Sequence, residues 1–169
     1  GCSPELDRKL TEWITRLRCD SRSGQQGPME IVALDHYLHE MRLFKSRSEL
    51  KIMRQAARIS SAAHKQVMQA CKPGVWEYQL EAVFTQACTH KGARAQAYPP
   101  IVGGGENGCT LHYIDNKDQL QDKQMLLIDA GCELDCYASD ITRSYPVNGR
   151  FSTAPVSYTH LTLPTTRLV

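Results

Sequence analysis

The sequence has no long apolar run, no strong excess of charge and no stretch that resembles a secretory signal. No segment approaches the roughly 18 apolar residues that a membrane-spanning helix needs, so we expect no membrane partner. The 20 basic and 18 acidic residues leave a formal net charge of only +2, and the basic residues are scattered. Without a basic patch we expect no nucleic-acid partner either. The charged N-terminal stretch also lacks the apolar centre of a signal peptide.

Cysteine is present, but without a pairing pattern. The seven cysteines are an odd number at irregular spacings, and no secretory signal accompanies them. We therefore expect reduced thiols and a cytoplasmic protein. Cys132 and Cys136 could suggest a metal pair, but no second pair follows. We interpret them as ordinary strand residues rather than zinc ligands.

The first half of the chain has the periodicity of helices. Helices are expected over residues 4–19, 46–72 and 77–91. The second of these has the clearest signals, because Ser46 and Glu49 form a capping-box pattern and Pro73 ends the helix. Residues 29–44, by contrast, are interpreted as a short strand followed by a linker.

The second half changes to strands and turns. Residues 124–134 form an apolar run that enters a glycine turn, which indicates a buried strand. Residues 136–149 are interpreted as a returning strand that ends in a turn at Asn148 and Gly149. Helices first and antiparallel strands afterwards predict an α+β fold, and no internal repeat is present.

The last stretch, residues 156–169, does not continue this pattern. VSYTHLTLPTTRLV is rich in threonine and contains no acid. It resembles a translated sequencing-library adaptor, so we exclude it from the fold. The alternative is a genuine β-strand tail.

Three glycines, Gly103, Gly105 and Gly108, satisfy the dinucleotide-binding pattern G-x-G-x-x-G. That fingerprint must open a helix, whose N-terminus holds the pyrophosphate. Residues 109–116 instead indicate strand and turn. We therefore discount a dinucleotide enzyme, and interpret the glycines as a loop that approaches a site closely.

Asp129 and Asp140 are the strongest candidates for chemistry. Asp129 directly follows three apolar strand residues, and Asp140 lies inside the expected returning strand. Such positions can face each other on one side of an antiparallel pair. Two carboxylates there would repel unless divalent cations lie between them, and carboxylate oxygens suit hard ions such as Mn²⁺ or Mg²⁺. The alternative is that Asp129 caps a turn and Asp140 is a solvated strand residue.

His112 is the third candidate, in a strand-like TLHY segment after the glycine loop. A histidine there could hold a substrate group or shuttle a proton. The alternative is a structural histidine in the core or on the surface. His90, near a helix end, is expected to interact with terminal carbonyls.

Four motifs together resemble a known family. They are HEMRLFKS, IVGGGENGCTLHY, LLIDAGCE and SDITRSYPVNGRF. In this combination and order they resemble the Xaa-Pro aminopeptidases (aminopeptidase P), of the creatinase/methionine-aminopeptidase "pita-bread" metallopeptidase family. The resemblance runs from about Glu5 to Phe151.

The resemblance implies a fold and a domain order. We expect the first half of a pita-bread catalytic domain, preceded by the end of an N-terminal domain. Residues 1–38 would be the end of that domain with a linker, residues 39–155 the catalytic half, and residues 156–169 the artefactual tail. The chain would then be a C-terminally truncated fragment.

The resemblance also implies an activity. The family releases the N-terminal residue from peptides with proline second, by attack of a metal-bound hydroxide on the scissile carbonyl. Two divalent ions, usually Mn²⁺, are held by two Asp, one His and two Glu. Asp129 and Asp140 match the two aspartates, and His112 matches a histidine in the substrate pocket. Family members are often homo-oligomers.

The remaining His ligand and both Glu ligands of the family have no match in this chain. We therefore expect the chain by itself to be inactive and poorly stable. Two alternatives share the fold: a prolidase-type dipeptidase, and a metal-free module that binds peptides or proteins. Methionine aminopeptidase is disfavoured, because it typically lacks the long lead before RLFKS.

Overall fold

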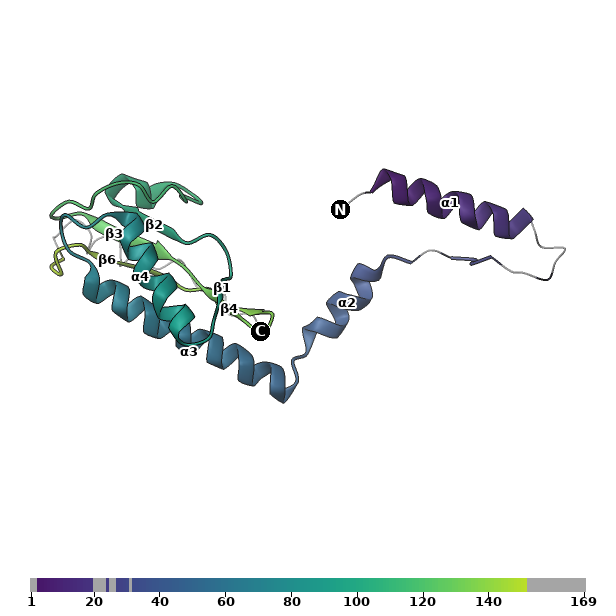
Figure 1. The fold of residues 1–169 in the computed structure, drawn as a ribbon, viewed down its shortest axis with the longest axis horizontal. Helices are drawn as coiled ribbons and strands as arrows, with labels where there is room; N and C mark the ends of the chain where they lie inside the picture. The colour runs from purple at the N-terminus through teal and green to yellow at the C-terminus, as the bar shows by residue number, and fades with distance from the viewer. Residues whose placement is uncertain (1–2, 20–23, 25–26, 31, 152–169) are drawn as a thin grey trace, which may run out of the picture. The chain divides into compact units, whose positions relative to one another are not determined.

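The computed structural model describes residues 3–19, 24, 27–30 and 32–151. The chain divides into two compact units, the first ending at Phe44 and the second beginning at Lys45 (Figure 1). The domain boundary expected after residue 38 stays a prediction. The tail predicted at residues 156–169 lies outside the described residues.

The first unit contains two helices. Helix α1, Pro4–Cys19, agrees with the prediction, and its exposed face carries i,i+4 ion pairs such as Lys9 Nζ–Glu5 Oε1 at 2.9 Å. Helix α2, Leu34–Leu43, occupies the segment predicted as strand and linker, so that prediction was wrong. The segment contains neither glycine nor proline. Its Asp35 lies in the first turn and Arg42 in the last, where each complements the helix dipole.

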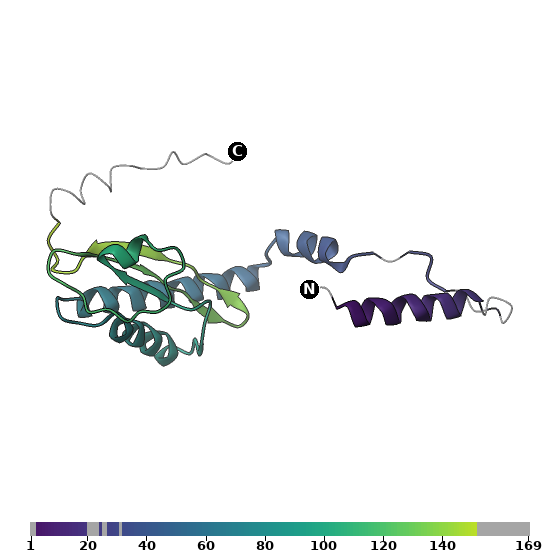
Figure 2. The ribbon, with the colours of Figure 1, turned by 90° about the horizontal axis from the view of Figure 1, so that it is seen from above.

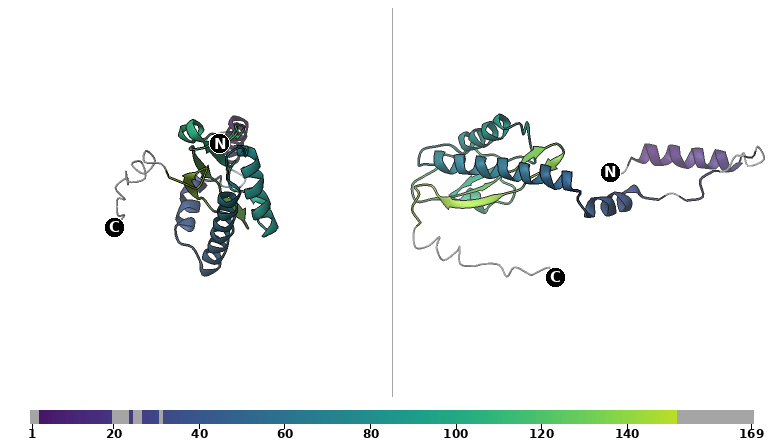
Figure 3. Two further views of the ribbon diagram at one scale, coloured as in Figure 1. Left: turned by 90° about the vertical axis from the view of Figure 1, so that its left-hand side faces the viewer. Right: turned by 90° about the horizontal axis from the view of Figure 1, so that it is seen from below.

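The second unit begins with the two helices that were predicted most clearly. Helix α3, Arg47–Ala70, starts with a complete capping box, in which the Glu49 amide donates to Ser46 Oγ at 3.3 Å. Helix α4, Glu77–His90, follows after Gly74, whose φ of +87° makes the turn. The helices lie side by side, and Figures 2 and 3 show α3 running the length of the unit.

Two three-stranded antiparallel sheets complete this unit, in the orders β1-β4-β5 and β2-β3-β6. The strands are β1 Ala95–Gln96, β2 Ile101–Gly104, β3 Met125–Asp129, β4 Cys132–Leu134, β5 Tyr137–Ala138 and β6 Thr142–Pro146, and a 3-10 helix, η2, spans Gly105–Cys109. The predicted returning strand is therefore two strands. It breaks at residues 139–141, where Ser139 is buried against α3.

The core lies between the helices and one face of the β2-β3-β6 sheet. Leu126 and Ile128 of β3 are fully buried among residues of α3 and α4 such as Val67 and Phe84. Because side chains alternate along a strand, Leu127 and Asp129 point to the opposite face. The helices thus fix which side of the sheet presents the acid. In the part of the chain that the structure describes, no helix is long and apolar enough to cross a membrane.

Candidate metal centre

The two candidate aspartates lie on neighbouring arms of one corner. Asp129 ends β3 and is paired with Thr142 of β6, while Asp140 lies two residues before Thr142. Asp140 is thus in the break between β5 and β6, not inside a strand as predicted. The Ala130 amide closes the corner by donating to Ile141 O at 3.2 Å.

A tyrosine joins the two acids. The Tyr98 hydroxyl lies 2.6 Å from Asp129 Oδ1 and 2.8 Å from Asp140 Oδ1. A phenol has one proton to donate, so two carboxylate oxygens converge on a single donor. Burial and the hydrogen bonds to both aspartates raise the pKa of Tyr98 far above its usual value, so the hydroxyl stays protonated.

Helix α3 holds the corner from behind. The His64 Nε2 atom lies 3.0 Å from Ala130 O, which fixes the peptide next to Asp129. On the other arm, Ser60 Oγ lies 2.7 Å from Ser139 Oγ, next to Asp140. At Gly131, a Cβ atom would lie 1.7 Å from Ser139 O, so only glycine allows the arms to come so close.

The donor chemistry of this corner suits a hard divalent ion, since both carboxylates offer oxygen ligands. It is, however, only part of a ligand set. Within residues 3–19, 24, 27–30 and 32–151, no group of three or more His, Cys, Asp and Glu side chains is placed to hold a metal ion. Asp129 and Asp140 therefore fit the carboxylate part of a metal site, to which other ligands must be added.

His112 lies in a turn after η2 and not in the strand-like segment that we predicted. Its side chain is exposed and its φ is +55°, an uncommon conformation for a residue other than glycine. Among the contacts of residues 32–151, no hydrogen bond or ion pair joins its ring to either aspartate. Its segment nevertheless follows η2, which covers the sheet face that carries Asp129.

The register shows why η2 lies on that face. Gly103 pairs with Leu127, and Ile101 with Asp129, so all four point to the same side of the sheet. A Cβ atom on Gly103 would lie 2.7 Å from the Gly108 amide nitrogen, and one on Gly108 would lie 3.3 Å from Leu127 Cβ. The glycines thus let the loop lie close to the sheet. The strand expected over residues 109–116 is absent, and η2 is a single short 3-10 segment rather than a dinucleotide-binding helix.

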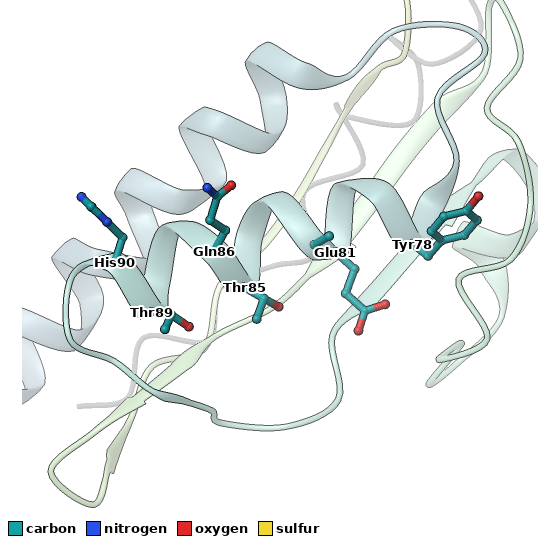
Figure 4. A pocket seen from close by; sticks show the side chains of 7 residues that line it. Tyr78, Glu81, Thr85, Gln86, Thr89 and His90 are labelled. Atoms are coloured by element: carbon teal, nitrogen blue, oxygen red, sulfur yellow. The ribbon is translucent and has the colours of Figure 1, made fainter.

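The sequence also singled out two cysteines and one histidine. Cys132 is buried in β4 and Cys136 is exposed in the following turn, and both are free thiols. His90 is exposed at the end of α4, along whose outer face runs an open hollow of about 660 Å³ (Figure 4). The hollow is lined by residues of α4 alone and contains neither aspartate.

Sequence reasoning missed Tyr98. It precedes two prolines in a connecting segment and carries no periodic signal. Its partners lie 31 and 42 residues away in the sequence, so only the tertiary fold brings the three residues together.

The chain is similar in sequence to known metallopeptidases. Residues 51–162 match the model of a family described as Metallopeptidase family M24. The chain is 45% identical over 141 residues to a Xaa-Pro aminopeptidase of Escherichia coli K12. The matched region covers 83% of this chain and 32% of that protein. It is 50% identical over 112 residues to a probable Xaa-Pro aminopeptidase of Pyrenophora tritici-repentis, covering 66% of this chain and 24% of the other.

The fold is also similar to solved structures of aminopeptidases. Proline aminopeptidase P II from Yersinia pestis superposes with a TM-score of 0.86 at 45% identity, covering 93% of this chain and 36% of that one. Aminopeptidase PepP from Pseudomonas aeruginosa has a TM-score of 0.84 at 51% identity, covering 90% and 35%. The chain thus spans about a quarter to a third of the length of these relatives.

Proposed function

Because the chain belongs to metallopeptidase family M24, we propose that the complete protein containing it is a metalloaminopeptidase that releases the N-terminal residue from peptides with proline second. Relatives at 45% and 50% identity bear the name Xaa-Pro aminopeptidase or probable Xaa-Pro aminopeptidase. The observation within this chain that carries the proposal is the convergence of Asp129 and Asp140 on one hydroxyl.

The family implies divalent metal ions, and we assign Asp129 and Asp140 as carboxylate ligands, with Mn²⁺ as the expected metal. When bound, such ions polarise the scissile carbonyl and activate water for attack. The chain's own contribution is to hold the two carboxylates close together, on a corner that contacts from α3 support. One His and two Glu ligands are proposed to come from sequence outside this chain.

We assign His112 to the substrate pocket. Its exposed ring follows η2, which lies on the sheet face that carries Asp129, and we propose that it meets a peptide there. There a neutral imidazole can donate a hydrogen bond to a substrate carbonyl, or accept a proton.

A cytoplasmic location and a homo-oligomeric assembly belong to the same proposal. The six described cysteines, all free thiols, support the former. The latter rests on family resemblance alone.

The test uses the complete protein, of the length of its relatives, loaded with Mn²⁺. We expect cleavage of Xaa-Pro-Xaa tripeptides, and a loss of kcat/KM on the order of 100-fold or more in Asp129→Asn and Asp140→Asn. Asp135→Asn is the matched control. This exposed residue lies in the turn between β4 and β5 at a φ of +48°, which asparagine adopts readily, so its activity should not change.

Two outcomes would contradict the proposal. Cleavage restricted to Xaa-Pro dipeptides would identify a prolidase-type dipeptidase. Saturable peptide binding without cleavage, unaffected by either aspartate variant, would identify a binding module of the same fold.

A further inference from the structure

Glu77 is a buried acid that the catalytic proposal does not use. It is the first residue of α4, and its side chain has no exposed surface. Within the described residues its carboxylate makes no ion pair. A buried carboxylate without a cationic partner is costly unless hydrogen-bond donors surround it.

Four donors from three separate stretches surround this carboxylate. Oε1 accepts from the Gly104 amide at 2.7 Å and from Asn107 Nδ2 at 3.1 Å. Oε2 accepts from the Tyr113 hydroxyl at 2.8 Å and from the Asp118 amide at 3.0 Å. Glu77 thus joins the end of β2, the 3-10 helix η2 and the segment that follows it.

Tyr113 is the link to the candidate site. Its side chain is buried while that of its neighbour His112 is exposed, so the two side chains point to different sides of the backbone. Burial and the hydrogen bond to Glu77 raise the pKa of Tyr113 to about 12, so the hydroxyl remains a donor. The anchored Tyr113 ring fixes the peptide that joins it to His112.

His112 needs such an anchor. Its φ of +55° is unfavourable for a residue with a Cβ atom, and conformations of this kind persist only where surrounding contacts impose them. The Asn107 and Gly104 bonds hold the loop on one side of His112, and the Tyr113 and Asp118 bonds hold the chain on the other. All four end on the same carboxylate.

We propose that Glu77 is a positioning residue, which acts through Tyr113 and η2 to hold His112 in the orientation that meets the substrate. The proposal rests on the assignment of His112 to the substrate pocket. It extends that assignment by naming the group that sets the geometry of the turn.

The variant that tests it is Glu77→Gln in the complete protein. A glutamine presents an N–H group to one pair of donors, so at least one backbone amide loses its acceptor. Glu106→Gln is the control, since Glu106 is an exposed acid in η2 and loses the same charge. Tyr113→Phe is a second variant, which keeps the ring and leaves the Glu77 carboxylate in place. It removes the hydroxyl that donates to Glu77 and accepts from Asn107 Nδ2 and the Lys117 amide.

The decisive readout is a double-mutant cycle with His112→Ala on a Xaa-Pro-Xaa tripeptide. We expect Glu77→Gln to lower kcat/KM on the order of 100-fold when His112 is present, and about 3-fold or less when it is alanine. Equal losses in the two backgrounds would show that Glu77 acts on the fold and would overturn the proposal. No effect of His112→Ala alone would instead overturn the assignment of His112.

A second readout does not depend on activity. In protein labelled with ¹³C only at histidine, the backbone Cα shift of His112 reports its left-handed conformation. Both Glu77→Gln and Tyr113→Phe should move this signal, and Glu106→Gln should leave it in place. If Glu77→Gln does not fold, Tyr113→Phe alone decides, and an unmoved His112 signal in a folded variant would overturn the proposal.

Discussion

At the scale of single residues, the Tyr98 hydroxyl defines the candidate centre. It is the one group within hydrogen-bond distance of both aspartates among the contacts of the described residues. Because its pKa is raised, this hydroxyl stays protonated, and it can donate its one hydrogen bond to either carboxylate. Loss of a group that orients a metal ligand typically costs about 10- to 100-fold in metal affinity.

Tyr98→Phe should therefore weaken metal binding while leaving the fold intact. We expect Mn²⁺ affinity of the complete protein, measured by titration calorimetry, to fall by about 10- to 100-fold. Tyr145→Phe is the matched control, because the buried Tyr145 hydroxyl has no partner within the described part of the chain. Equal affinities in the two variants would exclude an orienting role for Tyr98.

At the scale of elements, α3 supports the corner that carries the acids. Sequence periodicity predicted this helix and its capping box, because the signals are local and lie within a few residues of each other. The periodicity gave no indication that Ser60 and His64, which are buried in α3, form hydrogen bonds with Ser139 and Ala130. Those contacts span 79 and 66 residues, and so depend on how the sheet packs on the helix.

His64 makes the stability of this packing depend on pH. Burial lowers the pKa of His64 below its ordinary value of 6.5. Between the lowered pKa and 6.5 the unfolded chain binds the additional proton, so stability rises with pH in that window and is lost as pH falls below 6.5. We expect urea unfolding to show this loss, and His64→Gln, which cannot titrate, to reduce it.

The control for this pH dependence is His90→Gln, which removes an exposed histidine from the neighbouring helix. It should retain the wild-type dependence. A His64→Gln protein whose stability falls as steeply with acid as the wild type would contradict the role assigned to His64.

At the scale of the whole molecule, we propose that this chain carries one part of a metal site. It spans about a quarter to a third of the length of its relatives, and it brings two carboxylates together but no third ligand among the residues that the structure describes. The motif resemblance and the match to family M24 agree on the fold. A hard ion bound by two carboxylates keeps most of its water and is held weakly.

The 169-residue chain alone should therefore bind Mn²⁺ far less tightly than the complete protein. Loss of one orienting partner typically costs about 10- to 100-fold in affinity, so loss of several ligands should cost more than about 100-fold. Titration of both proteins measures this difference, and a purified sample of the short chain should cleave no Xaa-Pro peptide. Comparable affinities would mean that the missing ligands are not needed.

The sequence by itself determined the features that depend on near neighbours. These are the helices α1, α3 and α4, the strand that ends at Asp129, and the order of motifs that marks the family. Helix α2 was missed because the segment opens on apolar residues such as Ile31 and Val32, which favour a strand, and the helix that follows is only 10 residues long. Packing alone placed Asp140 outside a strand, set His112 in a left-handed turn, and gave Tyr98 and Glu77 their partners. Each of these depends on groups that are distant in sequence, because a buried polar atom is satisfied by whichever donor the fold brings to it.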